Sequence, residues 1–390
     1  MGNKTPFSRS LQSFEQIDAN ISRRYVVGKR IGRGCYGVVV EAYALQDKRY
    51  ERQPFAIKKI LNAFQNPHDA QRTYREARYL LEFSGHSSIV KLFDVMCSSD
   101  DRHLYLVLEL MDSDLQKALR VKALQKVHYT LVMWLLLRAL KYIHSAGIMH
   151  RDVKPANVLL SRDCDVKLAD FGWARESPAY GEGALMTDYA GSRWYRCPEM
   201  LFGAEMYTMA IDMWAVACID AEIHAEGAAL LPGTSTGDMI DRIIELTGKP
   251  AITDIFAMRT QRAVDCMGPV PPCTPDTSIV DKFPKETPEF HDFMQLLLQW
   301  NPEKRLTAEE AISHPHLMAF QNPDDEPIYG NQAGVRVTLD LQDGDLFSAS
   351  RYRDQLYAEV IGAPGSKQKV LRQRKQELTR WAFGGPDEGV

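Results

Sequence analysis

Residues 150–157 read His-Arg-Asp-Val-Lys-Pro-Ala-Asn, and residues 170–172 read Asp-Phe-Gly. The polar side chains that these two stretches offer for chemistry are Asp152, Lys154, Asn157 and Asp170. The Asp152 carboxylate can accept the proton of an incoming hydroxyl, and Lys154 can neutralise negative charge on a transferred group. Asn157 and Asp170 offer the hard oxygen ligands that Mg²⁺ takes in small numbers. These are the groups that phosphoryl transfer from a metal-bound nucleotide needs close together.

Neither tripeptide carries much weight alone, because His-Arg-Asp recurs by chance and Asp-Phe-Gly is most often an ordinary turn. Here both occur in order, with Lys154 and Asn157 in register between them. That combination argues against chance.

Length and composition limit the possible number of domains, the classes of partner and the cellular compartment. The chain has 390 residues, enough for two domains or one large bilobal domain. It carries 47 basic and 51 acidic residues, so bulk charge favours neither nucleic acid nor an anionic membrane as a partner. The seven cysteines are an odd number without metal-ligand spacing, and no apolar segment opens the chain. We therefore expect reduced thiols and a cytoplasmic or nuclear location.

Two apolar runs have to be separated from membrane spans. Residues 131–137 are too few, and residues 209–223 contain Asp212, Asp220 and Glu222. Both runs therefore predict buried helices. We also expect no lipid anchor, because Pro6 stands where an N-myristoylation motif requires Ser or Thr.

A glycine-rich turn lies near the start of the chain. Residues 1–22 are polar and predict a flexible leader, and from Tyr25 the pattern becomes strand, turn, strand. Glycines at 32, 34 and 37 remove Cβ atoms where backbone would fold over phosphates. A strand follows the turn instead of a helix, which argues against a dinucleotide-binding βαβ unit.

Lys58 stands in the apolar strand that comes next, Phe-Ala-Ile-Lys at 55–58. An unpaired ammonium would be costly there, so we expect phosphates and a carboxylate as its partners. The following helix should begin with Asn66 as N-cap and Pro67 in its first turn. It offers Glu76 as the natural partner of Lys58.

A second helix, predicted over residues 128–146 and ended by Gly147, leads into His150. Beyond Asp170 comes a segment up to Glu199 that is rich in Gly, Ser and Thr in its middle. We expect this segment to be a mobile loop.

Through these motifs the chain resembles a mitogen-activated protein kinase. The general kinase pattern covers about residues 25–318, including Asp-Met-Trp at 212–214. Thr187-Asp188-Tyr189, followed by Arg-Trp-Tyr-Arg-Cys-Pro-Glu at 193–199, narrows the resemblance to the mitogen-activated type.

The resemblance implies an α+β bilobal protein kinase fold. A leader at 1–22 would precede an N-lobe at 23–109, with a small antiparallel β-sheet plus a helix. A larger, mainly α-helical C-lobe would follow at 110–318, with an insert at about 226–290. Residues 319–390 would form a C-terminal extension. Glu199 and Arg305 are implied to pair as a buried salt bridge.

The resemblance also assigns the site. ATP would contact Ile31, Gly32, Gly34, Gly37, Val39, Ala56, Lys58, Glu109, Met111, Asp114 and Leu159. Within that set, the Glu109 carbonyl and the Met111 amide would hold adenine, and Asp114 would lie near the ribose. The catalytic residues would be Lys58, Glu76, Asp152 and Lys154, and the Mg²⁺ ligands would be Asn157 and Asp170.

Regulation is implied by Thr187 and Tyr189, since a phosphate on each would add charge that recruits arginines. Phosphorylated Thr187 would be held by Arg75, Arg151 and Arg175, and phosphorylated Tyr189 by Arg193 and Arg196. Arg196 would also shape a pocket that favours proline after the acceptor residue.

The extension leaves alternatives open. Asp340, Asp343 and Asp345 resemble an acidic docking groove for basic motifs, or they form a solvated acidic turn. The basic tail at 362–390 is either disordered or a short helix that packs on a lobe or a partner.

We therefore expect a monomeric, proline-directed serine/threonine kinase that uses ATP and Mg²⁺. It would act on proteins with Ser/Thr-Pro sites and bind a dual-specificity upstream kinase and phosphatases, but neither nucleic acid nor membrane. One alternative is a pseudokinase scaffold, whose usual mark is loss of the lysine, the catalytic Asp or a metal ligand; all are present here. Another is a kinase of the same group that phosphorylates its own loop.

Overall fold

The computed structural model describes residues 17–34, 37–45, 53–177, 193–268, 271, 273–331, 334–341 and 345–361. They fall into two compact units. The sheet unit is the described part of Met1–Gly85, Val90–Met111 and Asp345–Val390, and the helical unit is the described part of His86–Ile89 and Asp112–Gly344.

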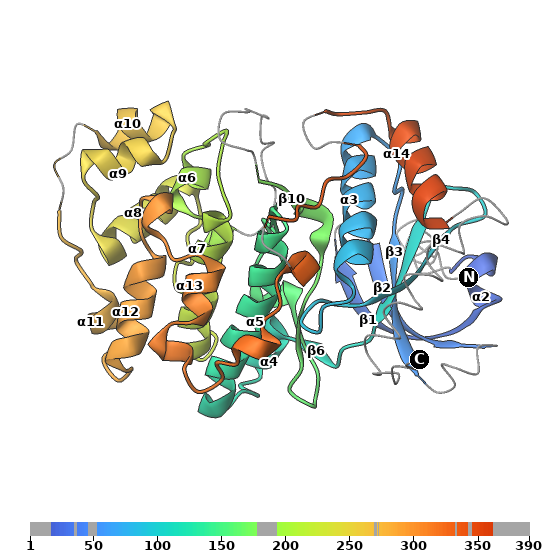
Figure 1. The fold of residues 1–390 in the computed structure, drawn as a ribbon, viewed down its shortest axis with the longest axis horizontal. Coiled ribbons are helices and arrows are strands. Elements are labelled where there is room, and N and C mark those ends of the chain that lie inside the picture. The colour runs from blue at the N-terminus through green and yellow to red at the C-terminus, as the bar shows by residue number, and fades with distance from the viewer. Residues whose placement is uncertain are drawn as a thin grey trace, which may run out of the picture. The chain divides into compact units, whose positions relative to one another are not determined.

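An antiparallel sheet with strand order β1-β2-β3-β5-β4 forms the centre of the sheet unit (Figure 1). Its strands are β1 (Tyr25–Gly34), β2 (Gly37–Ala44), β3 (Pro54–Ile60), β4 (Leu92–Cys97) and β5 (Leu104–Glu109). In β2 the alternate residues Val38, Val40 and Ala42 are buried, as expected of a strand with one face on a core. The sequence alternation therefore becomes one apolar face of this sheet.

Helix α3 (Pro67–Phe83) is the main helix of this unit, and it begins where the sequence indicates. Asn66 is its N-cap, with Oδ1 accepting a hydrogen bond from the Asp69 amide at 2.9 Å. Its buried face includes Tyr74, Glu76 and Leu80, so the helix brings one carboxylate inward among apolar side chains.

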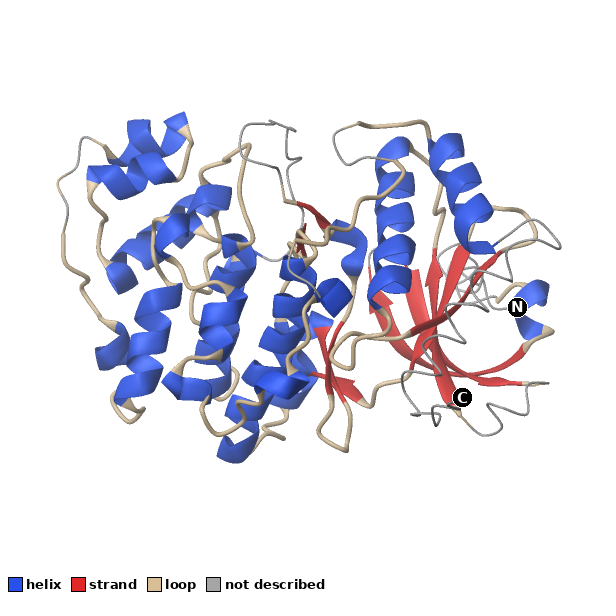
Figure 2. Ribbon diagram, in the orientation of Figure 1, coloured by secondary structure: helices blue, strands red, loops and turns tan. Residues whose placement is uncertain are grey.

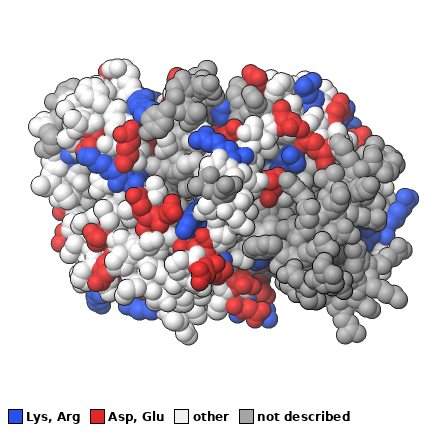
Figure 3. Space-filling model, viewed as in Figure 1, with Lys and Arg blue, Asp and Glu red and all other residues white. Residues whose placement is uncertain are grey.

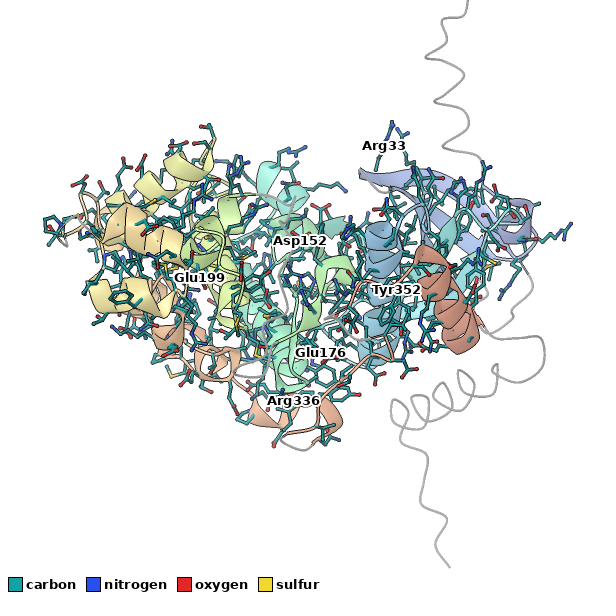
Figure 4. The ribbon with its side chains drawn as sticks, turned by 90° about the horizontal axis from the view of Figure 1, so that it is seen from above. Arg33, Asp152, Glu176, Glu199, Arg336 and Tyr352 are labelled. Atoms are coloured by element: carbon teal, nitrogen blue, oxygen red, sulfur yellow. The ribbon has the colours of Figure 1, made fainter. Side chains whose placement is uncertain are left out.

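The C-terminal part of the chain packs against α3. Helix α14 (Ala349–Leu356), continued by a π-helical turn at Tyr357–Ile361, runs beside α3 in Figures 1 and 4. The ring centroids of Tyr74 and Tyr352 are 5.7 Å apart, and Arg78 Nε lies 2.6 Å from Glu359 Oε2. Residues 345–361 are thus part of the sheet unit.

Part of the predicted flexible leader is folded. Helix α2 (Ala19–Ser22) is capped by Asp18, whose Oδ1 accepts from the Asn20 amide at 2.8 Å. Ile21 is completely buried and joins the core that contains Tyr25 and Phe55. This apolar anchor explains why the segment packs, and the prediction for residues 1–16 lies outside the described residues.

Helices dominate the other unit (Figure 2). They are α4 (Leu115–Arg120), α5 (Lys126–Ser145), α6 (Pro198–Leu201), α7 (Ala210–His224), α8 (Thr236–Thr247), α9 (Ile252–Ala257), α10 (Gln261–Met267), α11 (Ile279–Lys282), α12 (Pro288–Leu297) and α13 (Ala308–Ile312). Two small sheets accompany them: β6 (Ser113–Asp114), β8 (Val158–Leu160) and β9 (Val166–Leu168) form one, and β7 (Ile148–Met149) with β10 (Arg175–Glu176) the other.

Short 3-10 helices complete the described elements, at Pro155–Asn157, Phe171–Trp173, Arg193–Tyr195, Pro302–Lys304, Pro315–Leu317, Pro323–Asp325 and Tyr329–Asn331. Among the described helices, none has both the length and the apolar character that a bilayer crossing requires. Basic and acidic side chains are interspersed over the visible face (Figure 3), in keeping with the near balance of 47 and 51 such residues.

Helix α7 is buried all round, from Ile211 to Ile223. Such a helix belongs in the middle of a core, yet it carries buried carboxylates at Asp212, Asp220 and Glu222. Each of these needs a specific partner, because an unpaired charge is expensive away from water.

The expected salt bridge between Glu199 and Arg305 is present and fully buried. Arg305 Nη1 lies 2.6 Å from Glu199 Oε1, and Nη2 lies 2.7 Å from Oε2. The guanidinium also stacks over Trp214, 5.1 Å from its ring centroid. This bidentate salt bridge therefore connects α6, α7 and the segment before α13.

Candidate active site

The Asp152 carboxylate lies at the centre of the loop that follows β7. Lys154 Nζ is 2.7 Å from Asp152 Oδ2, and Asn157 Nδ2 donates to the same oxygen at 3.0 Å. Asn157 Nδ2 also donates to the Asp152 backbone carbonyl at 2.8 Å. The structure thus brings together three of the side chains that the sequence predicted as one site.

Burial sets the protonation behaviour of Asp152. Removal of water raises the pKa of its carboxyl above the ordinary value, the attraction of Lys154 opposes this, and the negative charge of Asp170 adds to the rise. A carboxylate with a raised pKa holds a proton more readily, as a general base requires.

Asp212 at the start of α7 fixes the backbone of this loop. Its Oδ2 accepts from the His150 amide and its Oδ1 from the Arg151 amide, each at 2.8 Å. Arg151 has a left-handed φ of 67°, which is uncommon for a side-chain-bearing residue and needs such support. The Asp212 carboxylate therefore determines the position of the chain directly before Asp152.

A half-buried histidine supports Asp212 from the other side, with His144 Nε2 2.9 Å from Asp212 Oδ2. Complete burial would raise the pKa of Asp212, but the hydrogen bond and charge of His144 and the His150 amide outweigh it, so the pKa is lowered. Asp212 thus remains an acceptor for both loop amides.

Asp170 lies next to Asn157 through the backbone, because the Ala169 amide donates to the Asn157 carbonyl at 2.9 Å. It has a left-handed φ of 64°. His150 Nε2 is 3.1 Å from the Ala169 carbonyl, and the His150 ring meets Phe171 edge-on at 4.9 Å. The turn that carries Asp170 is therefore held against the loop that carries Asp152.

Asn157 and Asp170 offer the ligand atoms that suit a hard divalent cation. The amide nitrogen of Asn157 is used by Asp152, which leaves its amide oxygen as the ligand atom, and Asp170 adds carboxylate oxygens. Mg²⁺ prefers such a set of few protein oxygens and completes it with water and phosphate.

In the sheet unit, Lys58 on β3 pairs with Glu76 on α3. Their side chains are 18% and 4% exposed, so the ion pair is largely shielded from solvent. Gly32, Val39 and Lys58 are successive partners across β1, β2 and β3. Strand register alone therefore places these three predicted nucleotide contacts in one row.

The predicted glycines differ in what makes glycine necessary. A Cβ on Gly37 would stand 1.9 Å from the Lys59 carbonyl oxygen, so the close approach of β3 excludes any side chain there. A Cβ on Gly34 would have nothing within 4 Å. Arg33 beside it is exposed at the end of β1 (Figure 4). Strand packing accounts for Gly37, and space for a ligand remains the interpretation for Gly34.

The remaining predicted ATP contacts are distributed over both units. In the sheet unit, Ile31 is on β1, Ala56 is buried on β3, Glu109 ends β5, and Met111 lies in the connector after it. In the helical unit, Asp114 and Leu159 are direct partners across β6 and β8. Asp114 also caps α4 through the Lys117 amide at 2.8 Å, so its carboxylate already has a structural use.

The predicted phosphate-binding arginines lie in both units, and Arg151 and Arg193 already donate hydrogen bonds within the helical unit. Arg151 and Arg175 are both buried in the helical unit, where Arg151 donates to the Trp173 carbonyl at 3.3 Å and to the Tyr207 hydroxyl. Arg193 donates to the Thr234 carbonyl at 3.3 Å, and Arg196 is half-buried. Arg75 is buried on α3 of the sheet unit. Thr187 and Tyr189 lie outside the described residues.

The predicted docking residues do not form one described group. Asp340 is exposed in the helical unit, between the buried Leu339 and Leu341. Asp345 is exposed in the sheet unit, where its carbonyl accepts from the Tyr352 hydroxyl at 3.1 Å. Asp343 lies outside the described residues.

Sequence reasoning did not assign roles to Asp212, His144 or Tyr207, although all three position the loop. The signal for Asp212 was present, since a carboxylate near the start of a mainly apolar run that predicts a buried helix must have a buried partner. Which backbone it binds could not be read from spacing, because the loop and α7 are far apart in the chain.

Comparison with known proteins adds independent information. A family model described as protein kinase domain matches residues 25–317. The chain is 42% identical over 372 residues to Extracellular signal-regulated kinase 2 of Dictyostelium discoideum, covering 94% of this chain and 97% of that protein. It is 38% identical over 369 residues to Mitogen-activated protein kinase 15 of Caenorhabditis elegans, covering 92% and 76%. For Mitogen-activated protein kinase 15 of Rattus norvegicus the identity is 39% over 353 residues, covering 89% and 62%.

Proposed function

Because the chain belongs to the mitogen-activated protein kinase family and is an ATP-dependent serine/threonine protein kinase, we propose that it is proline-directed and activated by phosphorylation of Thr187 and Tyr189. The observation that carries the chemical part is the Asp152 carboxylate, held between Lys154 and Asn157 on a loop fixed by Asp212.

In the proposed reaction Asp152 orients the substrate hydroxyl and accepts its proton, while Lys154 neutralises charge on the γ-phosphate. Lys58, aligned by Glu76, binds the nucleotide phosphates. Asn157 and Asp170 would hold Mg²⁺, which when bound neutralises the phosphate charge. Retention of all these groups speaks against a pseudokinase scaffold.

Proline specificity is supported by a small hollow beside Asp152, which is lined by Arg151, Asp152, Val153, Tyr195, Arg196, Met200, Ile211, Asp212 and Ala215. Tyr195 is fixed there, since its hydroxyl donates to Glu222 Oε2 at 2.7 Å. A residue after the acceptor would have to bury its backbone N–H in this hollow, and proline has none.

Activation through Thr187 and Tyr189 is supported by the concentration of arginines in the helical unit. Arg151 and Arg175 are buried, and both act electrostatically on Tyr207. A phosphate on Thr187 would add nearly two negative charges and several acceptor oxygens for such guanidinium groups.

A peptide kinase assay tests the proposal. The activated wild-type protein is expected to phosphorylate a Ser-Pro peptide about 5- to 150-fold faster than the matched Ser-Ala peptide, because one unsatisfied buried N–H costs about 1–3 kcal/mol. Asp170→Ala should abolish transfer, and Thr187→Ala should bind ATP but lose most activation. Equal rates on both peptides would remove proline direction and leave the kinase activity standing.

A kinase that phosphorylates its own Thr187 and Tyr189 is the remaining alternative. Mass spectrometry of an Asp152→Asn protein produced without other kinases separates the two, since transfer should fall about 10²–10⁴-fold. Phosphate on the wild-type loop that vanishes in Asp152→Asn would indicate self-phosphorylation, and its absence in both would indicate an upstream kinase.

We further propose protein partners that dock through Asp340, Asp343 and Asp345, and a monomer in the cytoplasm or nucleus. The described cysteines, which are Cys97, Cys164, Cys197, Cys218, Cys266 and Cys273, are all free thiols, which supports a reducing compartment.

A further inference from the structure

A second cluster of ligand-type side chains lies in the helical unit at the far end of α7 from the catalytic loop. It consists of Asp220 and His224 on α7 and His316 in the 3-10 helix Pro315–Leu317. Asp220 is eight residues beyond Asp212, or about 12 Å along a helix axis. The cluster is therefore separate from the groups that carry the phosphoryl-transfer chemistry.

Each of the three residues offers one ligand atom, and these atoms all lie within 4.8 Å of one another. His316 Nε2 is 3.1 Å from Asp220 Oδ2, and His224 Nε2 is 3.6 Å from Asp220 Oδ1. Ligand atoms placed tetrahedrally around Zn²⁺ at its usual bond lengths stand about 3.3 Å apart. Small side-chain adjustments would therefore admit an ion.

Burial makes this arrangement unfavourable without a further partner. The side chains of Asp220, His224 and His316 are 0%, 9% and 7% exposed. Among the described residues, nothing forms a hydrogen bond with Asp220 Oδ1 or with His224 Nε2. Leaving such atoms unsatisfied is costly, and a cation would satisfy both Oδ1 and Nε2 at once.

Glu286 supplies the outer part of such a site. Its Oε2 lies 3.0 Å from His224 Nδ1, on the opposite side of the ring from Nε2. A carboxylate at that nitrogen favours the proton on Nδ1 and leaves the Nε2 lone pair for a metal, which is the arrangement usual for metal-binding histidines.

Aromatic rings surround the cluster and limit its access to water. Tyr129 and Phe290 pack on the His224 ring, with centroids 5.1 and 4.4 Å away. Phe293 packs on His316 at 5.1 Å. The rings hold both imidazoles in place, while the exposed fractions of 9% and 7% leave a route for an ion.

We propose that Asp220, His224 and His316 bind Zn²⁺, with a water molecule as the fourth ligand and Glu286 fixing His224. Two imidazole nitrogens and one carboxylate oxygen form a donor set suited to zinc, whereas Mg²⁺ and Ca²⁺ prefer oxygen alone. The ion would tie the chain at His316 to the middle of the unit, so its role is to stabilise the fold.

Equilibrium dialysis of the chelator-treated full chain against Zn²⁺ tests this directly. Wild type is expected to retain one tightly bound zinc per chain, and its melting temperature should rise by several degrees at zinc concentrations well above the Kd. Replacement by Co²⁺ should give an absorption spectrum of nitrogen and oxygen ligands without a thiolate charge-transfer band, which excludes the cysteines.

Matched variants assign the site. His224→Leu, whose side chain can pack against Tyr129 and Phe290, should lose that zinc and the melting shift. Glu286→Gln retains all three ligands and should bind zinc about 10–100-fold more weakly. His68→Ala, at an exposed histidine on α3, is the control and should bind like wild type.

The proposal is overturned if wild type retains no zinc, or if either His224→Leu or Glu286→Gln binds it as tightly as wild type. A thiolate band with Co²⁺ would overturn it as well. Since Glu286→Gln changes no ligand and no core residue, it decides the question even if His224→Leu does not fold.

Discussion

At the scale of single residues, the chemistry depends on how strongly burial and neighbouring charges shift the pKa of Asp152. Asp152 and Asp170 are two carboxylates that influence each other, and burial of Asp152 makes its ionised form costly. Lys154 at 2.7 Å offsets part of that cost. The sequence gives the residue types. Burial, the Lys154 cation and the Asp170 carboxylate each act on the pKa of Asp152, and the size of each effect depends on the tertiary arrangement.

Lys154→Met is expected to shift the acidic limb of the kcat/KM profile to higher pH. Asp152 must be ionised to accept a proton, so activity falls as pH drops through its raised pKa, and loss of the opposing lysine raises that pKa further. The measurement is kcat/KM against pH on one peptide. Lys282→Met, at an exposed lysine on α11, is the control; an unchanged acidic limb in Lys154→Met would contradict the assignment.

The same shift has a consequence for stability. Because the folded pKa of Asp152 is raised, its contribution to the free energy of unfolding is fully present below the pKa of an unfolded aspartate. It is lost as pH rises through the folded pKa. The pH range in which Asp152 is ionised as a base is therefore also the range in which it contributes least to the free energy of unfolding.

At the scale of elements, α7 carries two separate sets of buried polar side chains in the helical unit. Asp212 near its start binds the loop backbone, and the Asp220 and His224 pair lies toward its end. The sequence predicted a buried helix over this run. It did not predict that Asp212 accepts hydrogen bonds from the catalytic loop, whereas Asp220 pairs with His316.

Asp212→Asn should lower both activity and stability. An asparagine has one acceptor oxygen, so its NH₂ group would face the amide of His150 or Arg151, and one loop hydrogen bond would become a donor–donor contact. We expect a loss of about 1–3 kcal/mol in the free energy of unfolding and a lower kcat with little change in the KM for ATP.

Urea denaturation and steady-state kinetics measure these two effects. Asp241→Asn, on the exposed face of α8, provides the matched control and should change neither. Wild-type kcat in Asp212→Asn would show that the loop holds its position without α7.

At the scale of the whole molecule, the chain returns to the sheet unit after the helical unit. Described residues 345–361 belong with β1–β5 and α3, although more than 230 residues of the helical unit come between. Tyr352 and Leu356 are completely buried there, and Gln71 Nε2 donates to the Tyr352 hydroxyl at 3.0 Å. Glu76, on the same helix as Gln71, is thus carried by an element that packs against residues 345–361.

A chain ending at residue 344 should have a weakened sheet unit. Loss of Tyr352, Leu356 and Val360 from the core removes about 5 kcal/mol of apolar burial, so the amides of α3 should exchange with solvent much faster. Hydrogen exchange read by mass spectrometry, with a chain ending at residue 361 as reference, checks this. Equal protection of α3 in both chains would show that α14 adds nothing to its stability.

Much of the protein was determined by the sequence alone. The two motifs at 150–157 and 170–172, the glycine turn and the strand with Lys58 predicted phosphoryl-transfer chemistry, because that reaction requires particular atoms close together. The bilobal fold and the family were implied by the resemblance, which Thr187-Asp188-Tyr189 and residues 193–199 narrowed to the mitogen-activated type. Local signals such as Asn66 and Pro67 also determined where α3 begins, since capping depends only on neighbouring residues.

Tertiary structure decided what depends on residues far apart in the chain. It joined Asp212 to the backbone at His150, placed residues 345–361 on α3, packed Ile21 into the sheet unit, and brought His316 to Asp220 and His224. Partners of buried polar groups are selected by packing in three dimensions, and a linear pattern shows that such a group needs a partner without showing which one it has.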